Sequence, residues 1–210
     1  MNYLDYLNLI ENKTPFAFSR YGDGEWQNIR MDLYPGSTHN CDGNIYYSDL
    51  GKRLEEIVST KQDYYMAIQR PSVRNWPWLV ETYRQDWVDS DIFHEASKNT
   101  NLVELFKVLK KVNVVYVGNK SLSNLSFVNS FIEIPLTNCW NSYEKYLEEI
   151  KKHITAEHKV FLFSAGMTAN VFVHDLWQFN KKNSYIDIGS VFDPYVGRNT
   201  RSYHFKLNLG

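Results

Sequence analysis

The sequence has few cysteines and carries neither of the common nucleotide-binding signatures. Only 2 of its 210 residues are cysteines, Cys41 and Cys139, too few for a disulfide scaffold or a four-cysteine zinc site, and a reducing compartment is the simpler inference. It contains no Walker sequence and no complete Gly-x-Gly-x-x-Gly fingerprint, which disfavours P-loop and classical dinucleotide chemistry. No apolar run reaches membrane-spanning length, so we expect no membrane span.

Charge of either sign is not in excess. The chain has 23 basic and 24 acidic residues, a net charge of −1, so no strong field draws it to nucleic acid or to an anionic membrane. Its first residues, Met-Asn-Tyr-Leu-Asp, lack the basic and apolar segments of a secretory signal. We therefore expect a cytoplasmic protein.

Helical and strand-like segments alternate along the chain. Apolar residues at helical spacing predict helices over 3–11, 50–60, 76–87, 102–111, 142–154 and 168–180. Short apolar runs predict strands that begin at Phe16 and cover 64–68, 112–117, 131–134, 158–163 and 185–188. This alternation predicts an α/β fold with a mostly parallel central sheet. Because the chain contains no internal repeat and no convincing linker, we expect residues 1–210 to form a single domain.

The first strand ends in a glycine-rich turn with two acidic residues. Asp23 lies between Gly22 and Gly24, and Glu25 follows. Two carboxylates on a tight turn can hold Mg²⁺ or Mn²⁺ together with substrate phosphates, and Arg20 just before them can meet an anion. The alternative is an ordinary turn in which Asp23 caps a helix that begins at Glu25. Arg20 favours the metal site, because a cap does not need a cation.

Polar or glycine-rich residues follow nearly every predicted strand. In parallel sheets, ligands bind outside the carboxyl ends of the strands, so these residues are expected on one rim. They are Arg20 to Glu25, Gln69–Arg70, Gly118 to Ser121, Thr137–Asn138, Ser164 to Gly166, and Asp187 to Ser190. The Ser164-Ala165-Gly166 turn opens into a helix and offers backbone N–H groups to a phosphate; the alternative is simple connection geometry.

The end of the chain and its aromatic residues offer further candidates. Arg198 and Arg201 can grip a phosphate or an acidic acceptor, and Asp193 can move a proton. The alternative is a solvated tail whose arginines pair with surface acids. The chain has 15 Tyr, 12 Phe and 6 Trp, and aromatic residues in polar surroundings, as in 74–78 and 138–141, suit sugar rings and nucleobases. Core packing is the alternative for each of them. The polar loop 35–49 is predicted to lie over a site.

Residues 18–25, 135–138, 164–169 and 186–189 together resemble the GT-D-type glycosyltransferases. The resemblance implies a Rossmann-like three-layer fold and transfer of a sugar from a nucleotide donor. It also implies that Asp23 and Glu25 are the Asp-x-Glu carboxylates that bind the metal and the donor diphosphate. Many members carry His after the Asp-Ile-Gly strand, where this chain has Ser190, and the acceptor side is therefore left open.

These observations together predict a metal-dependent glycosyltransferase that uses a UDP-sugar. Asp23, Glu25 and Arg20 are the predicted catalytic residues, with Asp193 as the acceptor base. The predicted donor-binding residues are Ser19, Gly22, Gly24, Gly118, Asn119, Asn138, Ser164, Ala165, Gly166, Arg198 and Arg201. The acceptor is a hydroxyl on a glycan, a protein or a modified DNA base. The rivals are another Rossmann-like transferase, such as a methyltransferase that binds its cofactor at 164–166, and a non-catalytic nucleotide- or carbohydrate-binding module.

Overall fold

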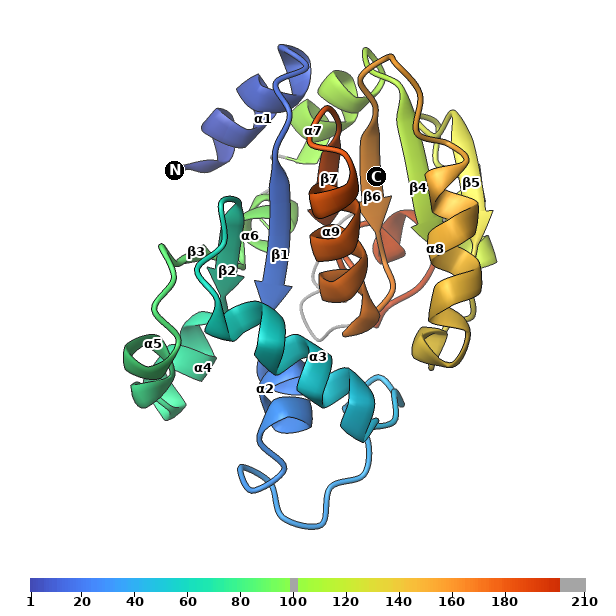
Figure 1. The fold of residues 1–210 in the computed structure, drawn as a ribbon. Coiled ribbons are helices and arrows are strands. Elements are labelled where there is room, and N and C mark those ends of the chain that lie inside the picture. Colours follow the sequence, from blue (N-terminus) through green and yellow to red (C-terminus); the bar gives the residue numbers. More distant parts are fainter. Residues whose placement is uncertain (99–101, 201–210) are drawn as a thin grey trace.

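The computed structural model describes residues 1–98 and 102–200, built around a seven-stranded sheet (Figure 1). The strand order is β3-β2-β1-β7-β6-β4-β5, and every pair of neighbours is parallel. The strands are β1 (Ala17–Tyr21), β2 (Tyr65–Ile68), β3 (Val88–Asp89), β4 (Val114–Gly118), β5 (Ser130–Glu133), β6 (Val160–Phe163) and β7 (Ser184–Asp187). The predicted α/β fold with a parallel sheet is confirmed.

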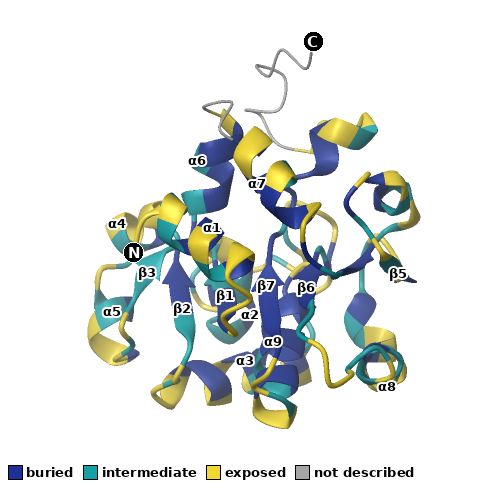
Figure 2. Cartoon of the chain, turned by 90° about the horizontal axis from the view of Figure 1, so that it is seen from above, coloured by how far each residue is buried: buried dark blue, intermediate teal, exposed yellow. Residues whose placement is uncertain are grey.

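Helices cover both faces of the sheet, which makes three layers (Figures 1 and 2). One face carries α1 (Tyr3–Glu11), α6 (Ile92–Lys98) and α7 (Leu102–Leu109), and the other carries α3 (Ser48–Ser59), α8 (Tyr143–Lys151) and α9 (Thr168–Phe179). Successive strand residues point to opposite faces, so Ala17 and Tyr21 join the core under α9 while Phe18 joins the core under α1. Both apolar cores therefore hold β1 in place.

The predicted helix over 76–87 is wrong. The segment instead contains one short helix, α5 (Trp78–Thr82). Another short helix, α4 (Arg70–Asn75), ends just before it, and the edge strand β3 follows. Pro77 explains the break, because a residue that precedes proline is disfavoured in the helical region, and Trp76 has φ −136° and ψ 67°. The sequence analysis also missed α6.

The segment after β7 is more ordered than a polar tail. Val191 and Phe192 are buried, and residues Asp193–Val196 form a turn of 3-10 helix. The Phe192 ring packs against Phe106 and Phe127, with ring centroids 5.4 and 4.9 Å apart.

Across the described ranges, no helix combines the length and the apolar character needed to cross a bilayer.

Candidate functional site

The candidate site lies at the carboxyl edge of the sheet, between β1 and β7. The chain leaves β1 toward β2 on one side and enters β7 from β6 on the other, so the direction of the connections changes there. Ligands bind at such switch points in open α/β sheets. The helix that follows β1, α2 (Asp23–Ile29), begins at this edge.

A cavity of about 390 Å³ opens at this point, and we call it the first cavity. It brings together six predicted site residues, namely Arg20, Gly22, Asp23, Gly24, Glu25 and Gly166. Asn40, Cys41 and Asp42 form part of its wall, so the loop predicted over 35–49 does lie beside the site. Asp91, His94 and Asp187 also line it. The volume is within the range of small-molecule sites, roughly 300–1,000 Å³.

The two acids of the glycine turn have different surroundings. Gly22 is the N-cap of α2, and its backbone N–H donates to Glu25 Oε2 at 2.8 Å. Glu25 therefore caps the helix, and the alternative in which Asp23 caps it is wrong. Asp23 is exposed at the helix start. Its Oδ1 accepts the N–H of Gly24 at 3.0 Å, and no described residue donates to its Oδ2.

Arg20 is fixed across the cavity from the glycine turn. Its Nε donates to the Ser90 carbonyl at 3.1 Å, and its Nη1 lies 3.9 Å from Asp187 Oδ1. Gly189 leaves room for this guanidinium, because a Cβ there would overlap Arg20 Nη1. Gly189 also has φ +58°, a backbone conformation that favours glycine. A larger residue at 189 would therefore displace the guanidinium as well as strain the backbone.

Two carboxyl groups in the cavity are difficult to ionise. Burial, reinforced by the nearby Asp187 charge, raises the pKa of Glu25 to about 7. Burial also raises the pKa of Asp187 to about 6, although Arg20 partly offsets the shift. Without a cation, the two negative charges repel each other in a poorly solvated space. A divalent ion would relieve that repulsion.

Asn170 on α9 links β1 to Glu25. The Ser19 hydroxyl donates to Asn170 Oδ1 at 2.6 Å, and Asn170 Nδ2 donates to Glu25 Oε1 at 3.4 Å. Ser19 and Asn170 are both fully buried. Ser19, predicted to bind the donor, is thus placed behind Glu25 and contacts it through Asn170.

A second cavity of about 330 Å³ adjoins the first and shares Cys41, Asp42, Gly166 and Gly189 with it. The predicted residues on its wall are Asn119, Ser164, Gly166, Asp193 and Arg198. The Ser164 hydroxyl is hydrogen-bonded to the Tyr116 hydroxyl at 2.8 Å and to the Gly189 carbonyl.

Asp193 lies in the wall of the second cavity, where both of its carboxylate oxygens have partners. Arg198 Nη1 is 3.6 Å from Asp193 Oδ1, and the Thr200 hydroxyl donates to Oδ2 at 2.6 Å. Its carboxyl group is buried. This arrangement fastens the end of the described chain; the role of Asp193 as acceptor base stays a prediction.

Three residues that were predicted to bind the sugar donor make local structural contacts, and a fourth lies outside the described residues. Ala165 is buried in the core. The Gly118 carbonyl accepts the N–H of Ile134, which extends the pairing of β4 with β5. The Asn138 side chain accepts the N–H of Ile45 at 2.8 Å, and its own N–H donates to Asn44 Oδ1 at 2.9 Å. Asn138 thereby ties the 35–49 loop to the sheet edge. Arg201 lies outside the described residues.

The carboxylate oxygens of the first cavity fit a hard divalent ion. Asp23 and Glu25 present carboxylate oxygens to one cavity, and Mg²⁺ or Mn²⁺ needs only one or two carboxylates when substrate phosphates complete the shell. Within the described ranges, no three His, Cys, Asp or Glu side chains are arranged to hold a metal by themselves. The geometry therefore suits a metal shared with a ligand.

Sequence reasoning missed Asn170, Asn44, Asp91 and His94 as site residues. Asn170 and Ser19 are 151 positions apart, and no local pattern signals such a contact. Asp187 was expected on the rim because it ends a buried strand, yet it was not assigned a catalytic or binding role.

Comparisons with known proteins support the fold. No protein-family model matches the chain, and no curated protein matches it. Among solved structures, one described as a selenomethionine form of domain of unknown function 1792 (DUF1792) gives a TM-score of 0.70 at 17% identity, covering 100% of this chain and 89% of that one. "A New Glycosyltransferase (DUF1792) from Streptococcus sanguinis" gives 0.69 at 17%, covering 99% and 92%.

A third neighbour is described in the words "the highly conserved domain of unknown function 1792 has a distinct glycosyltransferase fold". It gives a TM-score of 0.68 at 17% identity and covers 100% of this chain and 89% of that chain. At this identity the likeness concerns architecture. The chain therefore has the α/β glycosyltransferase fold described for these proteins.

Proposed function

We propose that this protein is a glycosyltransferase that uses Mn²⁺ or Mg²⁺ and a nucleotide-sugar donor, specifically a UDP-sugar. One observation carries the proposal: Asp23, Glu25 and Arg20 share a cavity at the switch point between β1 and β7. Carboxylates for a cation beside a guanidinium for an anion suit a metal-bound diphosphate. The fold agrees with this chemistry.

In the proposed reaction, the acceptor hydroxyl oxygen forms a bond to the anomeric carbon of the donor. The bond from that carbon to the diphosphate oxygen breaks, its electron pair leaves with the diphosphate, and the hydroxyl proton is released. The bound divalent ion would supply electrostatic stabilisation of the departing diphosphate. One such preorganised contact is typically worth about 3–4 kcal/mol of barrier.

The chain's own residues orient the donor in this proposal. Asp23 and Glu25 hold the cation, and the bonds from Gly22 and Asn170 fix the Glu25 carboxylate. Arg20, held by the Ser90 carbonyl, meets a phosphate oxygen. Backbone N–H groups at the start of the 12-residue helix α9, directly after Gly166, offer a second phosphate contact.

Ligand-dependent thermal stability tests the proposal, because a ligand that binds the folded state raises the melting temperature. We expect UDP to stabilise the protein with Mn²⁺ and to have little effect in EDTA. GDP should have a smaller effect, and S-adenosylmethionine, the methyltransferase cofactor, should have none. UDP-sugar turnover should require the metal.

Asp23→Asn is the informative variant and Asp86→Asn its matched control, because Asp86 is an exposed acid paired with Lys61. Asp23→Asn should lose the metal-dependent UDP shift and turnover with its unfolding unchanged, while Asp86→Asn keeps both. Normal turnover by Asp23→Asn would refute the metal site. If the protein binds UDP but turns over no member of a panel of nucleotide sugars, the non-catalytic binding module would be favoured.

A further inference from the structure

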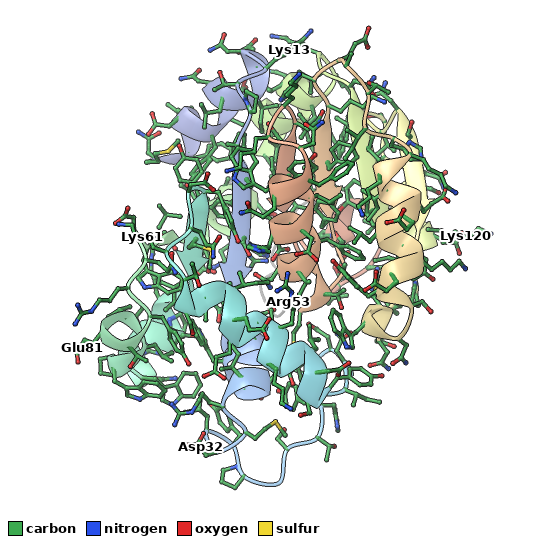
Figure 3. The ribbon with its side chains drawn as sticks, viewed as in Figure 1. Lys13, Asp32, Arg53, Lys61, Glu81 and Lys120 are labelled. Carbon is green, nitrogen blue, oxygen red and sulfur yellow. The ribbon has the colours of Figure 1, made fainter. Side chains whose placement is uncertain are left out.

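An aromatic patch lies beside the glycine turn, formed by Tyr34, Trp76 and Trp78. Tyr34 belongs to the loop after α2 and is 44% exposed. Its ring meets that of Trp76 edge to face, with centroids 5.5 Å apart and planes at 86°. Figure 3 shows Asp32, in the same loop, and Glu81, on α5, at the same end of the molecule.

A third cavity of about 500 Å³ reaches from Tyr34 of this patch to the first cavity. Tyr34, Gln27, Ser37 and His39 line it, and it shares Asp23 and Cys41 with the first cavity. Cys41 also borders the second cavity. The three cavities therefore meet at Cys41, and Asp23 lies at the junction of the first with the third.

The chemistry of the patch suits an uncharged sugar. Aromatic faces beside polar groups bind the apolar face of a sugar ring while its hydroxyls find partners. Over the described part of the chain, no acceptor is found for the indole N–H of Trp76 or Trp78. The Arg30 guanidinium lies 4.7 Å from the centre of the Trp78 ring, and it is paired with Asp32 at 2.9 Å. That cation is therefore already neutralised.

We propose that the third cavity and the aromatic patch bind the acceptor, and that this acceptor is an uncharged carbohydrate; the inference rests on the glycosyl transfer proposed above. In a nucleotide sugar the diphosphate separates the nucleoside from the sugar. With the diphosphate in the first cavity and the nucleoside in the second, the sugar points past Asp23 into the third. An acceptor ring stacked on Tyr34 then presents its hydroxyl at the Asp23 junction.

Saturation-transfer NMR with cellobiose, lactose and diacetylchitobiose, in the presence of UDP and diamagnetic Mg²⁺, tests the binding. At least one of them should receive saturation from the wild-type protein. Tyr34→Ala and Trp76→Ala should lose most of that signal and raise the acceptor KM about tenfold, with kcat nearly unchanged. Tyr34→Phe keeps the ring and should behave as wild type.

Phe179→Ala is the matched control, because Phe179 is 59% exposed at the end of α9, away from the first cavity. It should leave acceptor binding unchanged. The UDP and Mn²⁺ thermal shift separates the two hypotheses. If that shift is absent in the wild type, the proposed function fails. If it is present but no disaccharide binds, or if Tyr34→Ala transfers sugar as well as wild type, the acceptor-site inference fails.

Two further acceptors should be compared with the disaccharides in the sugar-transfer assay. They are a serine- and threonine-rich peptide and single-stranded DNA with a hydroxymethylated base. Efficient transfer to either, unaffected by Tyr34→Ala, would overturn the inference. Loss of transfer in Asp193→Asn with an unchanged acceptor KM in Tyr34→Ala and Trp76→Ala would instead move the acceptor to the second cavity.

Discussion

Replacement of Glu25 by glutamine should make the ligand-free protein more stable at high pH. Glu25 and Asp187 both line the first cavity, and burial raises the pKa of Glu25 to about 7 from its ordinary value of 4.5. The folded state therefore binds this proton more tightly than the unfolded state does. The resulting stability is complete below about pH 4.5 and is lost as the pH rises through about 7.

The structure sets the size of the effect. A pKa shift of this size lowers the free energy of unfolding of the wild type by roughly 3 kcal/mol at pH 8 and by less than about 1 kcal/mol at pH 5. Glutamine is never charged. Its oxygen can still accept the N–H of Gly22, but it loses the 3.4 Å contact with Asn170, a loss of about 1 kcal/mol. The variant should be about 2 kcal/mol more stable at pH 8 and nearly equal to wild type at pH 5.

Urea unfolding at the two pH values measures this difference, and heating should show a rise in Tm of roughly 4–8 °C at pH 8. Glu81→Gln, an exposed residue on α5, should show no such pH dependence. With Mn²⁺ and UDP present the order should reverse, because only the wild type gains ligand stabilisation. Equal destabilisation of Glu25→Gln at both pH values would refute the reasoning.

Three further variants test the surroundings of the site. Gly189→Ala should lower stability by at least about 1–2 kcal/mol, because it strains a backbone at φ +58° and meets Arg20; unchanged urea unfolding would contradict this. Asn44→Ala removes the acceptor for the Asn138 N–H, so limited proteolysis should cut the 35–49 loop faster at unchanged core stability. Asp193→Asn should cost about 2 kcal/mol by weakening its bonds to Arg198 and Thr200; loss of transfer at unchanged stability would support the acceptor-base role instead.

The sequence carried enough local information for the sheet and for the centre of the site. Buried parallel strands read as apolar runs, so β4, β6 and β7 were predictable, and their polar carboxyl ends indicated the rim. The Asp23 and Glu25 pair also follows from local pattern, because glycines on both sides of Asp23 mark the turn. Local pattern indicated Asp23 as the alternative cap of α2, whereas the structure gives this role to Glu25.

The rest depends on contacts that no window of sequence contains. β3 has only two residues, and its pairing with β2 defines it. Ser19 is linked to Glu25 through Asn170, which is 151 positions further along the chain than Ser19. The role of Asn138 as a ligand contact stays a prediction, but its hydrogen-bond partner Asn44 lies in a distant loop. Polar residues near a site are easy to find by sequence, but their partners are set by packing.

The position of Cys41 has a practical consequence. It is exposed, and it borders all three cavities, whereas burial raises the pKa of Cys139 to about 12. Thiolate reactivity follows exposure and low pKa, so a maleimide dye should couple to position 41 alone. The natural chain thus provides a site for a fluorescent reporter where the three cavities meet, and no engineered cysteine is needed.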